Sequence, residues 1–186
     1  MQPVLVFENA GELDPRFLST FGCSVKESDN PIGWFGTGLK FAIAVLLRTG
    51  HSIRVLTGTR QLEITTRTDT LRGQSFAFVC VDGEPAGFTT ELGKNWELWM
   101  AYRELYCNTK DEPAATIFET RRAPRPAAGC TRILVQGSGI LQQHARRGDF
   151  LLAEDAVPDF VFGEWEVFRS EEHTSELQSH SDLVCR

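Results

Sequence analysis

The stretch that decides the fold is residues 32–42, which read IGWFGTGLKFA. Three glycines, Gly33, Gly36 and Gly38, precede a nearly uninterrupted apolar run that extends to Thr49. Glycines let a backbone approach a ligand closely, and the N-terminus of the following helix attracts an anion such as phosphate. The stretch therefore predicts a glycine turn that opens a buried helix. This turn is either a phosphate cradle or an ordinary tight turn.

A second informative stretch is residues 98–111, which read LWMAYRELYCNTKD. Glu104, Asn108 and Asp111 stand at positions i, i+4 and i+7, so a helix would carry all three on one face. The residues at helical spacing beside that face are apolar, namely Leu98, Tyr102 and Leu105. The stretch predicts an amphipathic helix whose polar face is either part of a site or simply solvated.

Together the two stretches resemble motifs of the GHKL ATPases, the family of gyrase, the heat-shock-90 chaperones, histidine kinases and mismatch-repair ATPases. The first is similar to the second glycine box, I-G-x-F-G-x-G-F/L, and the other to the N-box, R-E-L-x-x-N-x-x-D. The resemblance implies that Glu104 is the general base of an ATPase and that Asn108 completes the coordination of Mg²⁺. It also implies that further residues contact the nucleotide, namely Gly33, Gly36, Thr37, Gly38, Leu39, Lys40 and Asp111.

The order of the motifs departs from the family pattern, in which the N-box helix comes first. Here Glu104 follows the glycine box, which implies a circularly permuted form of the fold. Permutation is tolerated when the original termini lie close together at the surface. Uncharacterised bacteriophage ATP-binding proteins are similar in this respect, and the resemblance covers residues 4–112. The fold implied is α+β, a two-layer α/β sandwich with a mixed, mostly antiparallel sheet.

The first glycine box of the family, D-x-G-x-G, is matched only in part. Residues 4–7 read VLVF and predict a strand, after which Asn9 stands where the family has the adenine-binding Asp. Asn9 still offers an acceptor oxygen, although without charge. Gly11 matches the first glycine, whereas Leu13 replaces the second. The adenine contact is therefore expected to be weaker than in the family, and a simple strand-ending turn is the alternative.

These motifs leave three functional hypotheses open. The first is a slow, Mg²⁺-dependent ATPase in which closure of a lid limits turnover. The second is a nucleotide-sensing or protein-interaction module that keeps the fold without turnover and serves an unknown protein partner. The third is a structural phage protein that nucleotide does not affect.

The remaining pattern predicts short elements around these motifs. Asp14 and Pro15 predict the start of a helix, and the polar residues 24–31 correspond to the family's mobile lid. Alternation and turn residues predict a hairpin over residues 52–57 and 61–66. Further strands are expected at residues 75–81, 86–90, 116–118 and 132–135.

Composition limits the class of protein. The formal net charge is −6, which argues against a broad nucleic-acid-binding face, and the longest apolar run is too short for a membrane span. The cysteines are scattered without a CxxC pair, so we expect neither a disulfide framework nor a zinc site. A cytoplasmic location is therefore the default expectation, in the host cell if the chain is encoded by a phage.

The C-terminal residues 169–186 need separate treatment. They resemble the translation of a sequencing adapter, and a natural polar tail is the alternative. We therefore expect residues 1–168 to form a single nucleotide-binding domain whose natural C-terminus is missing, and residues 169–186 to contribute nothing to it.

Overall fold

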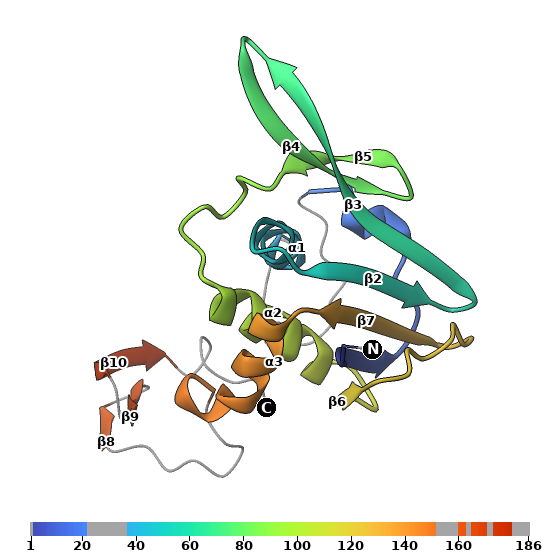
Figure 1. Cartoon of the computed structure of the whole chain (residues 1–186). Helices are drawn as coiled ribbons and strands as arrows, with labels where there is room; N and C mark the ends of the chain where they lie inside the picture. The colour runs from blue at the N-terminus through green and yellow to red at the C-terminus, as the bar shows by residue number, and fades with distance from the viewer. Residues whose placement is uncertain (1, 22–36, 152–159, 163–164, 171–172, 180–186) are drawn as a thin grey trace.

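The computed structural model describes residues 2–21, 37–151, 160–162, 165–170 and 173–179; for the last three ranges only the backbone is considered. The described part of residues 2–151 forms two layers, a twisted antiparallel sheet and a layer of helices on one of its faces (Figure 1). The α+β sandwich expected from the sequence is therefore confirmed. The sheet is entirely antiparallel between neighbouring described strands, rather than mixed.

The strand order in this sheet is β5-β4-β3-β2-β7-β1-β6. Its strands are β1 (Val4–Ala10), β2 (Ser52–Thr57), β3 (Arg60–Leu71), β4 (Gln74–Val81), β5 (Glu84–Thr89), β6 (Thr116–Thr120) and β7 (Cys130–Gln136). The helices are α1 (Gly38–Arg48), α2 (Leu98–Lys110) and α3 (Ser138–Ala145), with short 3-10 turns η1 (Pro15–Leu18) and η2 (Arg147–Asp149). A separate small sheet has the order β10-β9-β8, from β8 (Phe160–Phe162), β9 (Trp165–Ser170) and β10 (His173–Ser179).

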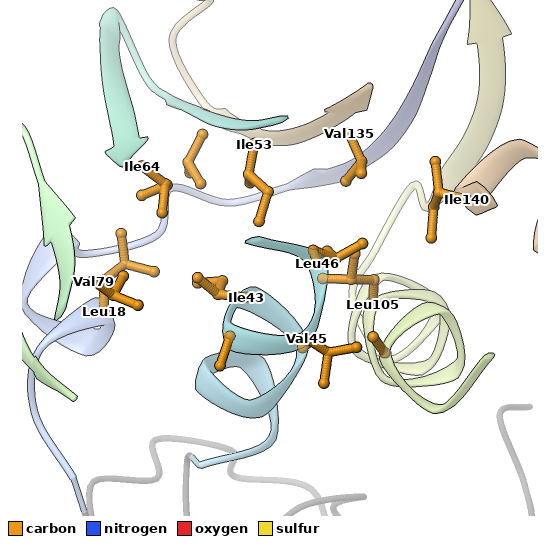
Figure 2. Close-up of a cluster of buried hydrophobic side chains, with 14 of the residues drawn as sticks. Leu18, Ile43, Val45, Leu46, Ile53, Ile64, Val79, Leu105, Val135 and Ile140 are labelled. Atoms are coloured by element: carbon orange, nitrogen blue, oxygen red, sulfur yellow. The ribbon is translucent and has the colours of Figure 1, made fainter. Parts of the chain in front are cut away.

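The core lies between the sheet and the helices. In β1, Leu5 and Phe7 point to the helix side, because side chains alternate across a strand. Apolar side chains of α1 meet them, and Figure 2 shows Ile43 and Leu46 beneath the sheet with Leu105 of α2 alongside. A smaller apolar cluster covers the other face and consists of Val4, Val6, Leu56 and Leu134 with Ala123 packed against it. Burial of α1 on most sides explains its nearly continuous apolar sequence.

Two tight turns define the β3–β4–β5 meander. Arg72 and Gly73 join β3 to β4, and both have positive φ values of 51° and 78°. Asp82 and Gly83 join β4 to β5 in the same way, with φ values of 50° and 85°. Positive φ at both central residues matches the twist of a two-residue hairpin and favours a glycine in the turn. The distal half of the β3–β4 hairpin projects beyond the rest of the sheet as an arm (Figure 1).

The predicted elements agree with the described ones in type, with three differences. The helix expected at Asp14 is one 3-10 turn, capped by the Asp14 carboxylate, which accepts a hydrogen bond from the backbone N–H of Arg16. Strand β3 continues to Leu71, five residues past the predicted end, because it pairs with β4 as far as Leu71 but with β2 only as far as Ile64. Helix α3 was not predicted. The expected lid, residues 24–31, lies outside the described residues.

Candidate functional site

Helix α1 begins where the glycine-rich stretch ends. Thr37 occupies the N-cap position, and its carbonyl oxygen accepts hydrogen bonds from the backbone N–H groups of Lys40 and Phe41. Gly38 is the first residue of the helix. Gly33 and Gly36 lie outside the described residues, so their predicted role stays a prediction. The described part of the motif thus places Gly38 at a helix N-terminus, where backbone N–H groups and the helix dipole favour an anion.

The carboxylate of Glu104 lies directly against Gly38. A Cβ atom added at Gly38 would overlap with both carboxylate oxygens of Glu104. Any side chain at position 38 would have to displace this carboxylate, so glycine is what allows the Glu104 carboxylate to lie against the start of α1. Two motifs that are separated by more than sixty residues in the sequence thereby meet in the structure.

Asn108 completes this arrangement one helical turn further along α2. Its Nδ2 donates a hydrogen bond of 2.7 Å to Oε1 of Glu104. The spacing of four residues on one helix brings the two side chains together. The other terminal atom of the Asn108 side chain is an amide oxygen, which can act as a ligand. Carboxylate and amide oxygens are ligands that Mg²⁺ accepts, so the pair suits a magnesium ion beside the α1 N-terminus.

The loop that follows β5 fixes the N-terminal end of α2 against the C-terminal end of α1. The guanidinium of Arg48, in the last turn of α1, donates hydrogen bonds to carbonyl oxygens of this loop, namely those of Thr90, Leu92, Gly93 and Trp96. Phe41 stacks on Trp96 with 5.0 Å between ring centroids. These contacts hold the residues just before α2 against α1. They thereby determine the position of Glu104 relative to the start of α1.

The partly matched first glycine box forms a rigid loop at the end of β1. Asn9 shares a row on the helix-facing side of the sheet with Thr131 and Thr57, because these residues are register partners. The Thr131 hydroxyl donates to the carbonyl of Gly11 and accepts from the N–H of Leu13, each at 2.8 Å. Thr57 donates to the carbonyl of Leu13 at 2.8 Å. The loop is thus tied across the sheet by two buried threonines.

Asn9 itself makes a local contact. Its Nδ2 donates a hydrogen bond of 2.7 Å to the carbonyl oxygen of Ala10. The side-chain oxygen is then the acceptor that could serve an adenine amino group. Gly11 has a φ of 91°, a conformation that favours glycine, so its presence after the strand has a backbone reason as well.

The β1 loop and the two helix motifs lie at the same end of the sandwich. The N–H of Ala10 donates to the carbonyl of Pro113, just beyond the C-terminus of α2, at 2.9 Å. Helix α1 turns tightly into β2, so its N-terminus lies toward the end of β2 at Thr57. Asn9 and Gly11 therefore lie near the point where α2 ends, whereas Gly38, Glu104 and Asn108 lie together at the start of α1.

Three other predicted residues have surroundings of their own. Lys40 is only 1% exposed, and its Nζ lies 5.0 Å from the centre of the Phe21 ring. Leu39 is half-buried and packs against the core. Asp111 is the exposed C-cap of α2, and its N–H donates to the carbonyl of Cys107. The expected phosphate contact of Lys40 and the nucleotide contacts of Leu39 and Asp111 stay predictions.

The sequence did not predict that a side chain of the protein itself caps the N-terminus of α3. Nε2 of His51 accepts the backbone N–H of Ile140, in the first turn of α3, at 3.1 Å. Its Nδ1 lies 2.9 Å from the Thr49 hydroxyl. His51 is 8% exposed, and burial lowers its pKa, which keeps the imidazole neutral and able to accept. The glycines of the Gly137-Ser138-Gly139 stretch were the signal, since an added Cβ at either one would meet His51.

Beside α3, Tyr102 and His144 form a second polar contact in the helix layer. The Tyr102 hydroxyl lies 2.8 Å from Nδ1 of His144. Burial raises the pKa of the Tyr102 hydroxyl and lowers the pKa of His144. The aromatic ring of Tyr102 also packs edge-on against Phe7 of β1. This contact ties α2 to α3 and to the sheet, and we read it as structural.

Neither metal clusters nor free thiols define a further site. Within residues 2–21 and 37–151, no group of three or more His, Cys, Asp or Glu side chains is placed to hold a metal ion. Cys80 and Cys130 are free, whereas Cys107 of α2 is disulfide-bonded. The scattered cysteines predicted no disulfide framework, and they gave no sign that Cys107 would be bonded.

Comparisons with known proteins add no assignment. A scan against models of protein families, a search of curated proteins and a search of solved structures all returned no match. Among the helices of the described residues, none combines the length and the apolarity that a membrane crossing requires.

Proposed function

We propose that this chain binds ATP with Mg²⁺ and hydrolyses it slowly, as a circularly permuted domain of the GHKL type. The observation that carries the proposal is the contact between Gly38 and the carboxylate of Glu104, with Asn108 hydrogen-bonded to that carboxylate. The proposed site requires the glycine box and the N-box to lie side by side, and Gly38 of the first motif contacts Glu104 of the second. An ordinary tight turn before a buried helix requires no such partner.

Each residue has a chemical role in this proposal. The backbone N–H groups at the start of α1, from Gly38 onward, would bind phosphate oxygens. The Glu104 carboxylate would accept a proton from the water that attacks the γ-phosphate. Asn108 would hold Mg²⁺ through its amide oxygen, and the ion when bound would neutralise charge on the phosphates. Asn9 and Gly11 would contact the adenine end.

The charge balance of the site supports a requirement for magnesium. A carboxylate at the α1 N-terminus is favoured by the helix dipole but repels a phosphate that approaches the same place. A cation between the two removes that repulsion. The net charge of −6 adds no broad attraction for polyanions, so we place ATP, rather than a nucleic acid, at this site and the protein in the cytoplasm, where ATP and Mg²⁺ are abundant.

The second candidate is a nucleotide-sensing or protein-interaction module without turnover. It is favoured by the first glycine box, in which Asn9 replaces an acid and donates to the neighbouring Ala10 carbonyl. An uncharged acceptor binds the adenine amino group less strongly than a carboxylate. A nucleotide held mainly by its phosphates would bind without the alignment that hydrolysis requires.

The proposal is tested by thermal unfolding of the whole 186-residue chain with ATP or ADP, each with and without Mg²⁺. Ligand at about 100 times its dissociation constant stabilises a protein by ~2.7 kcal/mol, which is a shift of roughly 5–10 °C for this size. We expect this shift with Mg²⁺, its loss in Asn108→Ala, and its retention in Asn95→Ala, a matched change at an exposed loop residue.

Release of phosphate then separates the two candidates. Turnover that is lost in Glu104→Ala but kept in Glu97→Ala, at the N-cap of α2, supports the ATPase. Tight binding without any phosphate release supports the sensing module. A folded protein that shows no shift with either nucleotide overturns both and leaves a structural protein as the conclusion.

A further inference from the structure

The β3–β4 arm carries an interaction surface that the proposed nucleotide site does not use. Strand β2 pairs with β3 only as far as Ile64, whereas β4 pairs with β3 through to Leu71. On the other side, pairing with β5 reaches Phe78, and one further bond joins the N–H of Thr90 to the carbonyl of Ala77. Beyond these points the arm is a two-stranded ribbon with no third described strand beside it.

The longer open edge belongs to β3. Every residue from Thr65 to Leu71 is exposed, and Leu71 is 53% exposed although it is a large apolar side chain. Figure 1 shows this part of the hairpin projecting away from the helices and from the remaining strands. An exposed strand edge presents a row of backbone N–H and C=O groups that can pair with another strand. A two-stranded ribbon is also only marginally stable by itself, so a third strand would stabilise it.

The sequence of this edge is complementary to itself. Residues 65–71 read TTRTDTL, with Arg67 and Asp69 on either side of Thr68. If two copies pair antiparallel about a two-fold axis at Thr68, Arg67 of each copy lies opposite Asp69 of the other. Opposite charges in directly facing positions stabilise a strand pair, and like charges destabilise it. The same register places Thr66 opposite Thr70, another favourable pair.

Charge also selects this register over its neighbours. An axis at residue 67 would place two copies of Arg67 opposite each other, and an axis at residue 69 would do the same with Asp69. Arg67 and Asp69 lie on the same face of β3, since they are two residues apart. That face also carries Phe78 and Phe76, which pair with Arg67 and Asp69 within the hairpin. Half-buried aromatic residues of β4 thus stand beside the charged residues whose pairing the second copy would complete.

We propose that the chain forms a two-fold symmetric dimer by antiparallel pairing of the open β3 edges of two copies, centred on Thr68. The contact is isologous, as expected for the commonest type of homodimer. It lies on the arm and involves none of the residues assigned to nucleotide binding, so it does not depend on the proposed function.

The test is sedimentation of the whole chain over a range of concentrations without nucleotide, together with three charge variants. We expect a dimer that dissociates on dilution, and a dissociation constant at least tenfold higher in Arg67→Asp and in Asp69→Arg, because each places like charges opposite each other. The double reversal, Arg67→Asp with Asp69→Arg, restores opposite charges in the same register and should restore the dimer. Lys94→Glu, at an exposed loop position outside the arm, should leave the dissociation constant unchanged.

A covalent readout checks the register itself. Thr68→Cys places one thiol of each copy at the two-fold axis, so mild oxidation should give a cross-linked dimer on a non-reducing gel, whereas wild type should not. A wild-type chain that stays monomeric at 200 µM, as it would if the charges of the edge only prevent pairing, overturns the proposal. So does a double reversal that fails to restore the dimer while each single variant remains folded.

Discussion

The N-termini of α1 and α3 look alike in the sequence and differ in the structure. Both helices begin within a Gly-x-Gly stretch, which is Gly36-Thr37-Gly38 at α1 and Gly137-Ser138-Gly139 at α3. In each case a polar side chain from another element lies against a glycine, which is Glu104 at α1 and His51 at α3. At α3 the buried imidazole accepts a hydrogen bond from a backbone N–H, so a side chain of the protein caps the N-terminus of this helix.

At α1 the side chain is a carboxylate that another polar residue holds. Glu104 is bonded to Asn108 on its own helix. A carboxylate that takes part in a hydrogen bond with its neighbour can still exchange partners with water, a metal ion or a phosphate-bound cation. The comparison shows that a Gly-x-Gly stretch at a helix start marks a place where a side chain from another element lies close to the backbone. The chemistry of that side chain decides whether the contact is structural or functional.

The largest expected effect is a difference in stability between His51→Ala and Glu104→Ala. Removing the buried imidazole leaves the Ile140 N–H without its acceptor and opens a cavity, which should cost ~2–4 kcal/mol. Removing Glu104 should cost less than ~1 kcal/mol, because the side chain is only half-buried and its hydrogen bond to Asn108 lies within one helix. Urea unfolding of the two variants measures this difference. Equal losses of stability would mean that the two helix N-termini are equivalent and that the Glu104 carboxylate is structural.

The second effect compares alanine at two glycines. Gly139→Ala would collide with Leu98 and His51 and should cost ~1–3 kcal/mol of stability without a direct effect on nucleotide. Gly38→Ala would meet the end of a flexible side chain, so we expect a smaller loss of stability but a loss of the Mg²⁺-nucleotide thermal shift. If Gly38→Ala unfolds the chain as strongly as Gly139→Ala does, the contact at α1 is a packing contact.

The third effect is a dependence of stability on pH. Burial lowers the folded-state pKa of His51 below its usual value near 6.5, so the unfolded chain takes up a proton more readily. Stability should be fully present above pH 6.5 and should fall as the pH drops toward the folded-state pKa, with a slope of at most about 1.4 kcal/mol per pH unit for each histidine. His144, whose pKa burial also lowers, contributes in the same direction.

Urea unfolding between pH 5 and 8 measures this slope. His51→Gln keeps a polar side chain of similar reach and cannot be protonated, so its slope should be shallower than that of wild type. An unchanged slope would show that the imidazole at α3 is not held in its neutral form.

The smallest expected effect is on binding of nucleotide in the absence of Mg²⁺. Glu104→Gln removes the negative charge beside the α1 N-terminus, where such charges typically matter by ~0.3–1 kcal/mol. ATP should therefore bind about two- to fivefold more tightly without the ion, while phosphate release is lost. Titration calorimetry with and without Mg²⁺ measures both affinities. Weaker binding in this variant would mean that the carboxylate does not face the phosphates.

Much of the fold could be read from local patterns. The apolar run after Gly38 predicted α1, alternation predicted β2 and the first part of β3, and helical spacing predicted α2. Helix α3 was not predicted, because its short sequence has weak periodicity and its start depends on the imidazole of His51. The 3-10 turn at Asp14 has a sound capping sequence, but it is followed by too few helical residues to continue.

The contact between two candidate residues could be predicted from the sequence, but the surroundings of the others could not. Glu104 and Asn108 share a helix face by spacing alone, so their contact follows from the sequence. The contact of Lys40 with the Phe21 ring could not be foreseen, because the two residues are nineteen positions apart in the chain and no local pattern links them. The tie of Leu13 to Thr57 and Thr131 required the register of three strands.

The sequence by itself determined the type of most elements, the glycine-rich start of α1 and the spacing of Glu104 and Asn108, because these depend on local backbone preferences and on the period of a helix. Only the tertiary structure decided that Glu104 lies on Gly38, that His51 closes α3 and that the β3 edge remains open. Each of these depends on contacts between residues far apart in the chain, and packing and register set those contacts.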